Sequence, residues 1–485
     1  MIMSTAILTL LEELQQRPLP QWYEDAKFGI FIHWGLFAQP AFAPKLGSIV
    51  DSFKQDYDRA VALTPYTEWY ANAIKIPGTP SAEFHQSEFN NCAYTDFKQN
   101  FVEGLKNWDV DAWAENFAAS GAKYVVLVTK HHDGYCLWPS AINNPHELNW
   151  YSERDIVGEL AQAVRAKGLR FGLYYSGGID WTFNREPLFT LADFLGSVPA
   201  DDYPQYATQQ VQELIQRYKP DVLWNDISWP TDHPSLIKLF AEYYQQVPEG
   251  VVNDRWRHND IFTRAMRYKL VRRVFDWAAK RYIKKNTDKV EGVMPSVIPH
   301  SDFRTPEYMR FDDTQVKKWE CTRGMSHSFG FNRNDRDEDY TSADDLLCDF
   351  IDAVAKNGNL LLNVGPDING QIPTPQIERL QHFGQWLKRN GDAIYTTKPW
   401  RQAEATTTCG VPVRFTCHGR KVFIILLGAT SNCQLTIPKL NLSGSVSLLD
   451  GDDHVEMQNV GGDCQLRFGQ ALPQQVGQVL VVEQA

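Results

Sequence analysis

The chain has 485 residues, which is too long for one average domain and suits a large barrel followed by a small module. Its composition, with 43% hydrophobic and 22% charged residues, is that of a globular protein. The net charge of -11 argues against nucleic acid as the main partner, because neutralising phosphates needs a basic surface.

The cysteines and the N-terminus both indicate a reducing compartment. The eight cysteines are scattered, without a CxxC pair or zinc-finger spacing, which suits reduced thiols better than a disulfide framework. Residues 1–6 lack the basic segment of a signal peptide, and the short apolar stretch after them runs into Glu12 and Glu13. No window approaches about 18 apolar residues. We therefore expect a cytoplasmic protein without a membrane span.

From about residue 105 to 395, amphipathic helices alternate with short apolar strands. This alternation predicts parallel βα units with right-handed crossovers, and six or seven such strands favour a (β/α)8-type barrel. No GxGxxG follows a strand, which argues against a dinucleotide-binding sheet. The predicted strands are 29–32, 124–128, 171–175, 221–226, 251–252 and 360–362, and the predicted helices include 109–120, 155–166, one ending at Tyr218, one starting near Pro234, and 342–355.

The pattern of apolar and polar residues changes after Pro399 and Trp400. Short alternating runs at 411–416, 422–427 and 434–437 are separated by Gly, Asn and Asp turns. Such runs are typical of an all-β module. We therefore predict a catalytic barrel over residues 1–397 and a C-terminal β-sandwich over residues 398–485.

Polar side chains follow most of the predicted barrel strands. In a parallel barrel, functional groups gather at the C-terminal ends of the strands. Imidazole, indole, carboxylate and guanidinium groups can together bind hydroxyls and stack on a pyranose face. One strand-end histidine is more often structural, but polar residues at several strand ends of one barrel predict a sugar site. In chain order the ends carry His33-Trp34, His131-His132-Asp133, Tyr175-Ser176, Trp224-Asn225-Asp226, Asn253-Asp254-Arg255-Trp256 and Glu320.

Other kinds of chemistry find less support in the sequence. His33, His131, His132 and Asp226 could bind zinc, but the first strand has no His-x-His and the chain has no HExxH. Adjacent His131 and His132 on a strand would also point to opposite sides, so both cannot easily face one ion without a bulge. No GxSxG occurs, no obvious base lies beside Cys136, and there is no P-loop. We therefore expect neither a metal nor an organic cofactor.

Two carboxylates remain as candidates for catalysis. Asp226 ends an apolar strand, where a lone buried carboxylate is costly unless it is paired or receives donors. Retaining glycoside hydrolysis uses an ionised carboxylate nucleophile and a protonated acid about 5–5.5 Å apart. Asp226 suits the nucleophile, because Arg255 and histidines would hold its pKa down. Glu307, in the loop 302–308, suits the acid, and Glu68 beside Trp69 is the second candidate.

Six motifs follow one another in the order of a known family. They are Phe28-Gly29-Ile30-Phe31-Ile32-His33-Trp34-Gly35, Lys130-His131-His132-Asp133-Gly134 with Leu137-Trp138, Tyr174-Tyr175-Ser176, Leu223-Trp224-Asn225-Asp226, Asn253-Asp254-Arg255-Trp256 and Trp319-Glu320. Together they resemble the α-L-fucosidases of glycoside hydrolase family 29, over about residues 20 to 400. The β-sandwich has a weaker similarity.

The resemblance implies a retaining exo-α-L-fucosidase that acts on fucosylated oligosaccharides or glycoconjugates. It assigns Asp226 as the nucleophile and Glu307 as the general acid/base. It places Phe31 and Phe329 around the methyl group of the 6-deoxy sugar. A fucose-binding lectin-like protein and an exo-glycosidase for α-L-galactosides are the alternatives, and linkage, aglycone and transglycosylation stay open. The remaining sugar contacts that it implies are His33, Glu68, Trp69, His131, His132, Tyr175, Trp224 and Arg255.

A basic insertion over about residues 257–299 departs from the family pattern. Residues 257–289 contain eleven Lys or Arg and three Asp. Apolar residues at every fourth position predict one stripe of an amphipathic helix. Such a helix could pack on its own chain with a solvated basic face, contact a second subunit in a homo-oligomer, or bind lipid or nucleic acid. Because the insertion precedes Glu307, we hypothesise that it also shapes the leaving-group side of the pocket. The stripe consists of Phe262, Met266, Leu270, Val274 and Ala278.

Overall fold

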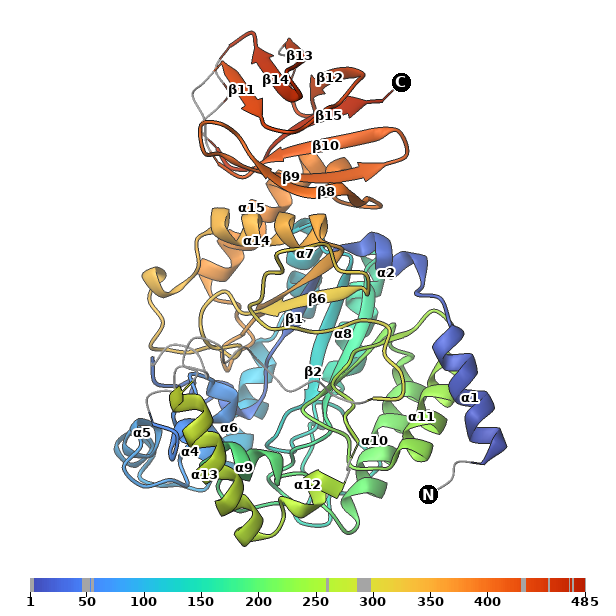
Figure 1. Cartoon of the computed structure of the whole chain (residues 1–485). Helices are drawn as coiled ribbons and strands as arrows, with labels where there is room; N and C mark the ends of the chain where they lie inside the picture. Colours follow the sequence, from blue (N-terminus) through green and yellow to red (C-terminus); the bar gives the residue numbers. More distant parts are fainter. Residues whose placement is uncertain are drawn as a thin grey trace.

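A curved parallel sheet of seven strands forms the centre of the larger part of the molecule (Figure 1). The computed structural model describes residues 4–45, 53, 56–258, 261–285, 298–428, 433–451, 454–470, 472 and 475–484. The strand order is β5-β4-β3-β2-β1-β7-β6, and every pairing in it is parallel. The predicted barrel architecture is confirmed. The strands are β1 Phe28–Ile32, β2 Tyr124–Lys130, β3 Arg170–Ser176, β4 Val222–Asp226, β5 Val251–Val252, β6 Trp319–Arg323 and β7 Gly358–Val364.

The segment 302–308 fills the gap between the edge strands β5 and β6. On the β6 side, the Arg304 amide donates to the Lys318 carbonyl at 3.0 Å, and the Glu320 amide donates to the Arg304 carbonyl at 2.7 Å. On the β5 side, the Asp302 amide donates to the Val252 carbonyl at 2.9 Å. The segment that carries Glu307 therefore takes the place of an eighth strand.

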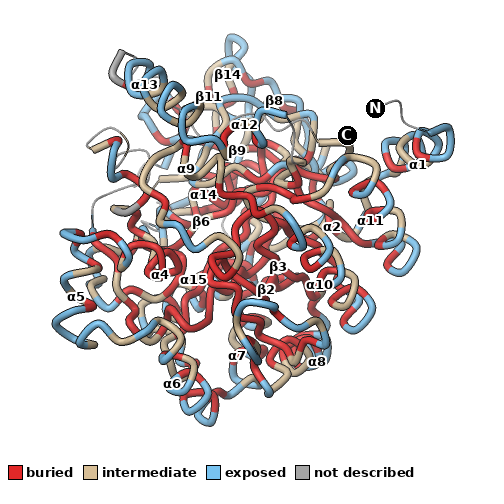
Figure 2. The backbone as a smooth tube through the Cα atoms, turned by 90° about the horizontal axis from the view of Figure 1, so that it is seen from below, coloured by how far each residue is buried: buried red, intermediate tan, exposed pale blue. Residues whose placement is uncertain are grey.

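Helices cover the outside of the sheet, and the strands are buried on both faces (Figure 2). Several helices begin at the capping residues that the sequence suggests. Asp155 accepts a hydrogen bond from the Gly158 amide at 2.9 Å, and Ser342 accepts one from the Asp345 amide at 3.1 Å. The helices around the barrel are α1 Thr5–Gln16, α2 Gln21–Ala26, α4 Tyr70–Ala73, α5 Pro80–Phe89, α6 Phe97–Gly104, α7 Val110–Ala119, α8 Ile156–Ala166, α9 Leu191–Leu195, α10 Tyr203–Tyr218, α11 His233–Gln246, α14 Ala343–Ala355 and α15 Thr374–Asn390.

Two antiparallel sheets follow the barrel and enclose a separate apolar core. One has the order β12-β15-β10-β9-β8 and the other β11-β14-β13, so the predicted sandwich is confirmed. The proposed boundary at 397/398 lies directly before β8. The strands are β8 Lys398–Thr406, β9 Pro412–His418, β10 Lys421–Leu426, β11 Gln434–Ile437, β12 Ser445–Leu448, β13 Val455–Val460, β14 Asp463–Phe468 and β15 Gln478–Glu483.

The described part of the insertion forms two helices, α12 Ile261–Ala265 and α13 Lys269–Lys285, so the prediction of one continuous stripe is wrong. A turn at 266–268 changes the helical phase. Met266 is therefore buried, with 2% exposed, whereas Leu270 is 73% exposed and Val274 faces solvent too. The rest of the insertion, 259–260 and 286–297, lies outside the described residues. Among the residues that are described, no helix combines the length and apolar character needed to cross a membrane.

Candidate active site

Asp226 stands at the C-terminal end of β4, on the face that points into the barrel. In the parallel ladder, Asp226 pairs with Ser176 and Trp224 pairs with Tyr174. The Asp226 carboxylate accepts a hydrogen bond from the Tyr174 hydroxyl at 2.9 Å and one from Arg255 Nη1 at 3.0 Å. Burial alone would raise the pKa of Asp226, but Arg255 and the Tyr174 hydroxyl outweigh it and hold the pKa below its ordinary value. Asp226 is therefore ionised at neutral pH.

Arg255 connects the two candidate carboxylates through one nitrogen. Its Nη1 lies 3.0 Å from Asp226 Oδ1 and 2.6 Å from Glu307 Oε1. The two oxygens therefore cannot be farther apart than about 5.6 Å, the sum of these distances, which is compatible with the spacing of retaining rather than inverting glycosidases. The far side of the guanidinium is held by Thr305, whose hydroxyl accepts from Nε at 3.0 Å and whose carbonyl accepts from Nη2 at 2.8 Å.

Glu307 is the more accessible of the two carboxylates. Its side chain is 31% exposed, compared with 14% for Asp226. In both cases the next residue has a left-handed backbone, with φ 69° at Ile227 and φ 52° at Tyr308. Non-glycine residues seldom adopt this conformation, and it costs about 1–2 kcal/mol. The chain thus turns sharply just after each carboxylate.

Three histidines line the inner wall, and burial is the main cause that keeps them neutral. The pKa of His33 falls to about 4, that of His132 falls to about 3, and that of His131 lies well below its ordinary value. Asn363 contacts His33 Nδ1 at 2.6 Å, and Ser176 contacts His132 Nδ1 at 2.6 Å. His131 Nδ1 is buried without a hydrogen-bond partner in the described part of the chain. Neutral imidazoles both donate and accept, as sugar hydroxyls do.

The expectation that His131 and His132 point to opposite sides is wrong. β2 ends at Lys130, and its ladder to β3 shifts register between Val128 and Lys130. The two imidazoles lie 4.0 Å apart between ring centroids. Even so, within the described ranges no three His, Cys, Asp or Glu side chains are grouped as a metal site would require.

Glu68 and Trp69 belong to the outer wall of the site. Glu68 is buried, accepts a hydrogen bond from the Gly330 amide at 3.1 Å, and has a pKa that burial raises to about 7. The indole of Trp69 meets the His132 ring edge to face at 5.0 Å and packs against Trp181 and Phe194. Glu68, Trp69 and the aromatic residues around Trp69 therefore form the wall of the site next to α9.

Phe31 and Phe329 both pack against the imidazole of His33. Their ring centroids are 4.5 Å and 4.9 Å from the imidazole. Phe31 also lies 5.3 Å from Trp224, inside the barrel. The structure therefore brings the two predicted phenylalanines together beside the inner wall.

Tyr175, by contrast, lies outside the site. Its hydroxyl donates to Gln210 on α10 at 2.9 Å, and Lys130 covers its ring at 4.5 Å, both on the helix side of the sheet. Its neighbour Tyr174 points inward and contacts Asp226. The prediction of a contact from Tyr175 is thus corrected to Tyr174. Because the strand is buried on both faces, the hydrophobic pattern of the sequence contains no signal for the direction.

Sequence reasoning also missed the residues that hold the site in place. Asn363, Ser176 and Thr305 orient His33, His132 and Arg255. The Thr305 hydroxyl in turn donates to Asp254 at 2.8 Å. Of these residues, only Ser176 and Asp254 have a signal in the sequence, because both follow a predicted barrel strand.

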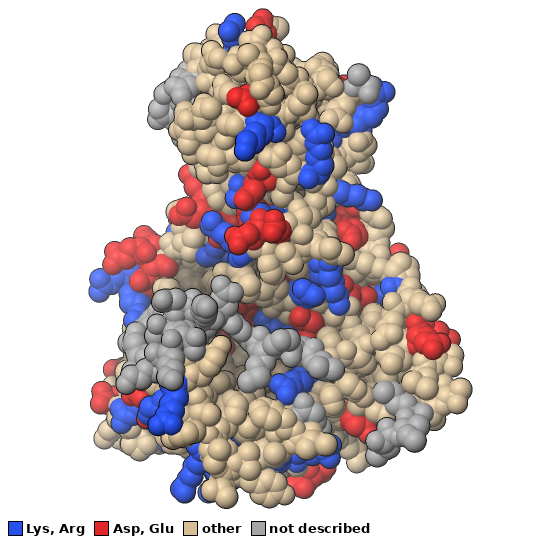
Figure 3. Space-filling view, in the orientation of Figure 1, with Lys and Arg blue, Asp and Glu red and all other residues tan. Residues whose placement is uncertain are grey.

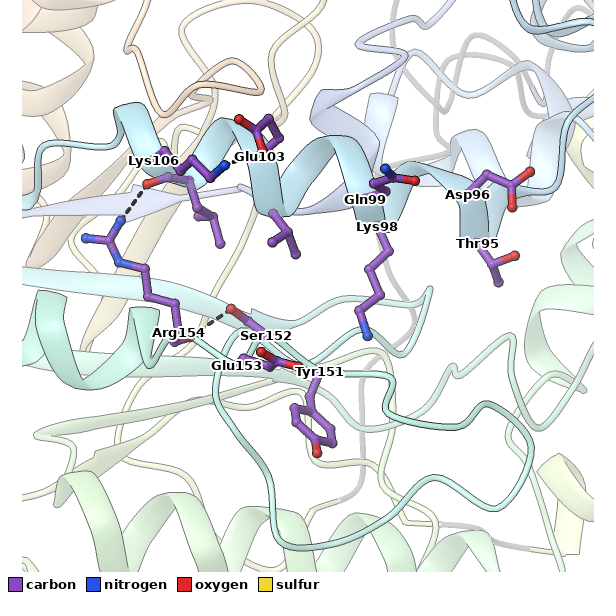
Figure 4. A pocket seen from close by; sticks show the side chains of 12 residues that line it. Thr95, Asp96, Lys98, Gln99, Glu103, Lys106, Tyr151, Ser152, Glu153 and Arg154 are labelled. Atoms are coloured by element: carbon purple, nitrogen blue, oxygen red, sulfur yellow. Dashed lines mark hydrogen bonds and ion pairs between the residues drawn. The ribbon is translucent and has the colours of Figure 1, made fainter.

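A hollow of about 960 Å³ lies between α6 and residues 151–154 and includes none of the groups around Asp226 (Figure 4). Large pockets are the usual first candidates for active sites. Here, however, the charged groups are used by their own neighbours: Lys98 donates to the Asn149 carbonyl, Arg154 to the Leu105 carbonyl and Lys106 to Glu103. The strand ends around Asp226 are the better candidate, because their groups converge.

Two carboxylates that share an arginine at the C-terminal end of a parallel barrel are equipped for glycosidic bond cleavage. This fold and this site define a glycoside hydrolase. The family model described as Alpha-L-fucosidase matches residues 4–392, and the chain belongs to this family.

Individual proteins agree with this result. The chain is 33% identical to tissue alpha-L-fucosidase of Bos taurus over 429 residues, which is 85% of this chain and 76% of that protein. It is 34% identical to alpha-L-fucosidase of Branchiostoma floridae over 460 residues, or 90% and 86%. The solved structure of Thermotoga maritima alpha-fucosidase in complex with fucose matches with a TM-score of 0.80 at 37% identity, covering 97% and 98%.

Proposed function

We propose that this chain is a retaining exo-α-L-fucosidase that releases terminal α-L-fucose from fucosylated oligosaccharides or glycoconjugates. The observation that carries the proposal is the contact of one Arg255 nitrogen with both Asp226 and Glu307. It keeps the two carboxylates at a spacing compatible with a covalent intermediate. Membership of the alpha-L-fucosidase family supports the choice of sugar.

The reaction proceeds in two displacements. In the first, Asp226 attacks C1, the bond from C1 to the leaving oxygen breaks, and Glu307 gives its proton to that oxygen. In the second, Glu307 takes a proton from water, and the water oxygen attacks C1 and displaces the Asp226 carboxylate. The depressed pKa of Asp226 suits the nucleophile, which must be ionised. The greater exposure of Glu307 suits a group that meets both the leaving group and water.

The inner wall is suited to recognise the sugar. The unpartnered, buried Nδ1 of His131 can bond a sugar hydroxyl, since buried polar atoms are otherwise nearly always satisfied. His33 and His132 are oriented by protein groups at Nδ1, which directs their other nitrogen to the ligand. Phe31 and Phe329 supply apolar surface for the methyl group of fucose.

Replacing each carboxylate tests these roles. Asp226→Ala is expected to lower kcat by several orders of magnitude, with partial rescue by azide and inverted product. Glu307→Ala is expected to impair fucosides with poor leaving groups far more than activated aryl fucosides, because the latter need little protonation. If Glu68→Ala shows this leaving-group dependence and Glu307→Ala does not, Glu68 is the acid instead.

One assay distinguishes the activities that the sequence left open. Proton NMR of aryl α-L-fucoside hydrolysis reports turnover and the configuration of the first product together. We expect turnover with retention. Tight fucose binding without turnover would indicate a lectin-like protein, and faster hydrolysis of the α-L-galactoside would show that Phe31 and Phe329 do not enclose a methyl group.

We also propose that the chain forms a homo-oligomer through the outer side of α13. Leu270, Val274, Trp277 and Tyr282 are each more than half exposed there, and exposed apolar clusters often mark contact surfaces. Sedimentation of the wild type as a multimer and of Trp277→Asp as a monomer is the expected result. A monomeric wild type would contradict it.

We further propose a reducing, cytoplasmic setting. No disulfide joins the eight cysteines, all of which lie in the described residues, and burial raises the pKa of Cys136 to about 12. Thiol titration of protein prepared without reductant should therefore count eight thiols, and fractionation of the source cells should recover the activity in the cytosol. Recovery outside the cytosol would contradict this setting.

A further inference from the structure

A second buried carboxylate lies inside the barrel, next to Trp224. Glu320 extends from β6 into the interior and is fully buried. Its Oε2 accepts hydrogen bonds from the hydroxyls of Tyr23 at 2.8 Å and Tyr124 at 2.6 Å. Its Oε1 accepts one from Trp224 Nε1 at 3.2 Å. The mechanism above does not use this group.

The surroundings of Glu320 suit an acceptor. Three donors converge on it from α2, β2 and β4, although burial outweighs them and raises the pKa of Glu320 to about 7. A buried carboxylate without such donors would cost several kcal/mol. An apolar residue at this position would stabilise the core more than a buried carboxyl group does. We therefore expect Glu320 to have a role beyond packing.

Trp224 links Glu320 to the catalytic groups. Its ring supports the guanidinium of Arg255, with Cζ 4.7 Å from the ring centroid. It also stacks on Tyr174, at 5.5 Å and an interplanar angle of 22°. Arg255 and Tyr174 both donate hydrogen bonds to the Asp226 carboxylate. A carboxylate on the indole N–H fixes the ring plane and adds electron density to it, which strengthens its attraction for a cation.

We propose that Glu320 is a positioning residue that acts through Trp224 to hold Arg255 between Asp226 and Glu307. The proposal rests on the proposed function, since it assigns Glu320 a part in the same reaction. Without the carboxylate, Trp224 loses the acceptor for its N–H, and Arg255 loses a fixed surface. The ion pair that keeps Asp226 ionised then weakens.

The pH profile separates this role from a simple effect of charge. The groups that face Asp226 are Arg255 after β5, His132 after β2, Tyr174 on β3 and, with a smaller influence, His33 after β1. Burial raises the pKa of Glu320 to about 7, so its carboxyl is protonated in the pH range of the acidic limb and its removal changes no charge there. Loosening Arg255 would raise the pKa of Asp226. The direction in which the acidic limb of kcat/KM moves therefore identifies the role.

The experiment compares Glu320→Gln, Trp224→Phe, the double variant and Tyr23→Phe with the wild type on an aryl α-L-fucoside. Glu320→Gln is expected to lower kcat/KM at least tenfold and to move the acidic limb to higher pH. Trp224→Phe, which keeps a ring but removes the N–H, should do the same. The double variant should be no worse than the poorer single variant, because both remove one interaction. Tyr23→Phe removes another donor to Glu320 without touching Trp224 and should stay within twofold of the wild type.

Several outcomes would overturn the proposal. They are an acidic limb that moves to lower pH, losses that multiply in the double variant, or a Tyr23→Phe variant as impaired as Glu320→Gln. If Glu320→Gln does not fold, unchanged kinetics and pH profile in Trp224→Phe overturn it as well. An inactive wild type would overturn the proposed function, whereas an active wild type with an unaffected Glu320→Gln overturns this inference alone.

Discussion

At the scale of single residues, Arg255 controls the electrostatics of the site. It faces Asp226 and Glu307, and these two carboxylates raise the pKa of its guanidinium although burial would lower it. The planar guanidinium donates to Thr305 through Nε and Nη2, which leaves Nη1 for both carboxylates. A lysine has the charge but not this geometry. The ion pair and the two carboxylates are thus positioned by one side chain.

Removing the hydroxyl of either Tyr174 or Tyr175, which are adjacent on β3, tests which of the two tyrosines acts in the active site. Tyr174→Phe removes a hydrogen bond that lowers the pKa of Asp226, so the acidic limb of kcat/KM should move to higher pH and kcat/KM should fall about tenfold, the value of one charged hydrogen bond. Tyr175→Phe is the matched control, since it only frees Gln210. It should stay within about twofold of wild-type activity and lose about 1 kcal/mol of stability. The reverse pattern would contradict the assignment of Tyr174.

The raised pKa of Glu68 predicts a pH-dependent stability. Burial moves it from 4.5 to about 7, so between these values the folded state binds a proton that the unfolded state has released. Stability from this group therefore falls as pH rises from about 4.5 to 7, by up to about 3 kcal/mol at 1.4 kcal/mol per pKa unit. In chemical denaturation, Glu68→Gln should match the wild type at pH 5 and exceed it at pH 8. The exposed Glu338→Gln is the control, and equal gains in both variants would contradict the prediction.

At the scale of elements, the segment 302–308 has two functions. It completes the barrel between β5 and β6, and it presents Glu307 opposite Asp226. Backbone hydrogen bonds to β6 hold Glu307 in a fixed position relative to the sheet. A group on a paired segment is better placed for catalysis than one on a free loop.

The helix α13 holds two loops of the outer wall through Asp276. Its carboxylate accepts hydrogen bonds from the Tyr57 hydroxyl at 2.8 Å, the Thr190 hydroxyl at 2.9 Å and the Ala192 amide at 3.2 Å. Thr190 caps α9, and Phe194 on α9 stacks against Trp69. The helix is thus connected to the wall of the site by a short chain of contacts.

Asp276→Ala is expected to lower the free energy of unfolding by about 1–3 kcal/mol, because three donors lose their acceptor. It should also speed hydrogen exchange over residues 189–196 and change KM among fucosides with different aglycones more than kcat for an aryl fucoside. Arg273→Ala, on the exposed side of the same helix, is the control. If hydrogen exchange over 189–196 and aglycone preference both stay as in the wild type, α13 does not shape the wall.

At the scale of the whole molecule, the sandwich is attached to α14 and α15 of the barrel (Figure 1). The indole of Trp386 donates to the Gly477 carbonyl at 2.9 Å, and Asp352 on α14 is buried between Lys356 and Arg414. On the face drawn in Figure 3, acidic and basic side chains are interspersed over both parts. The contact is also apolar, because Phe423, Ile425 and Val479 of β10 and β15 belong to the same buried cluster as the barrel core. Its ion pairs make it specific for one relative position.

Arg414→Met is expected to destabilise the whole chain by about 1–3 kcal/mol, because it leaves Asp352 with Lys356 as its remaining described ion-pair partner. Activity of the folded protein should be unchanged, since Arg414 lies in the sandwich. Calorimetry measures the shift, and the exposed Arg467→Met is the control. Two separate transitions in the wild type would show that the parts unfold independently and would contradict this coupling.

The sequence by itself determined the architecture and most of the site, because both depend on local signals. Strand and helix alternation, caps and turn residues lie within a few positions of one another, and polar residues at strand ends must meet at one edge of a parallel barrel. Asp226, the histidines, Arg255 and the change to a sandwich after residue 397 were visible in this way.

Only the tertiary structure decided the direction of side chains and the contacts between distant segments. On strands buried on both faces, nothing local distinguishes Tyr174 from Tyr175. The role of residues 302–308 as the closing segment, the turn that divides the insertion into α12 and α13, and the link from Glu320 through Trp224 to Arg255 each join parts far apart in the chain. Such contacts follow from packing in three dimensions, which the order of residues along the chain specifies only through the complete fold.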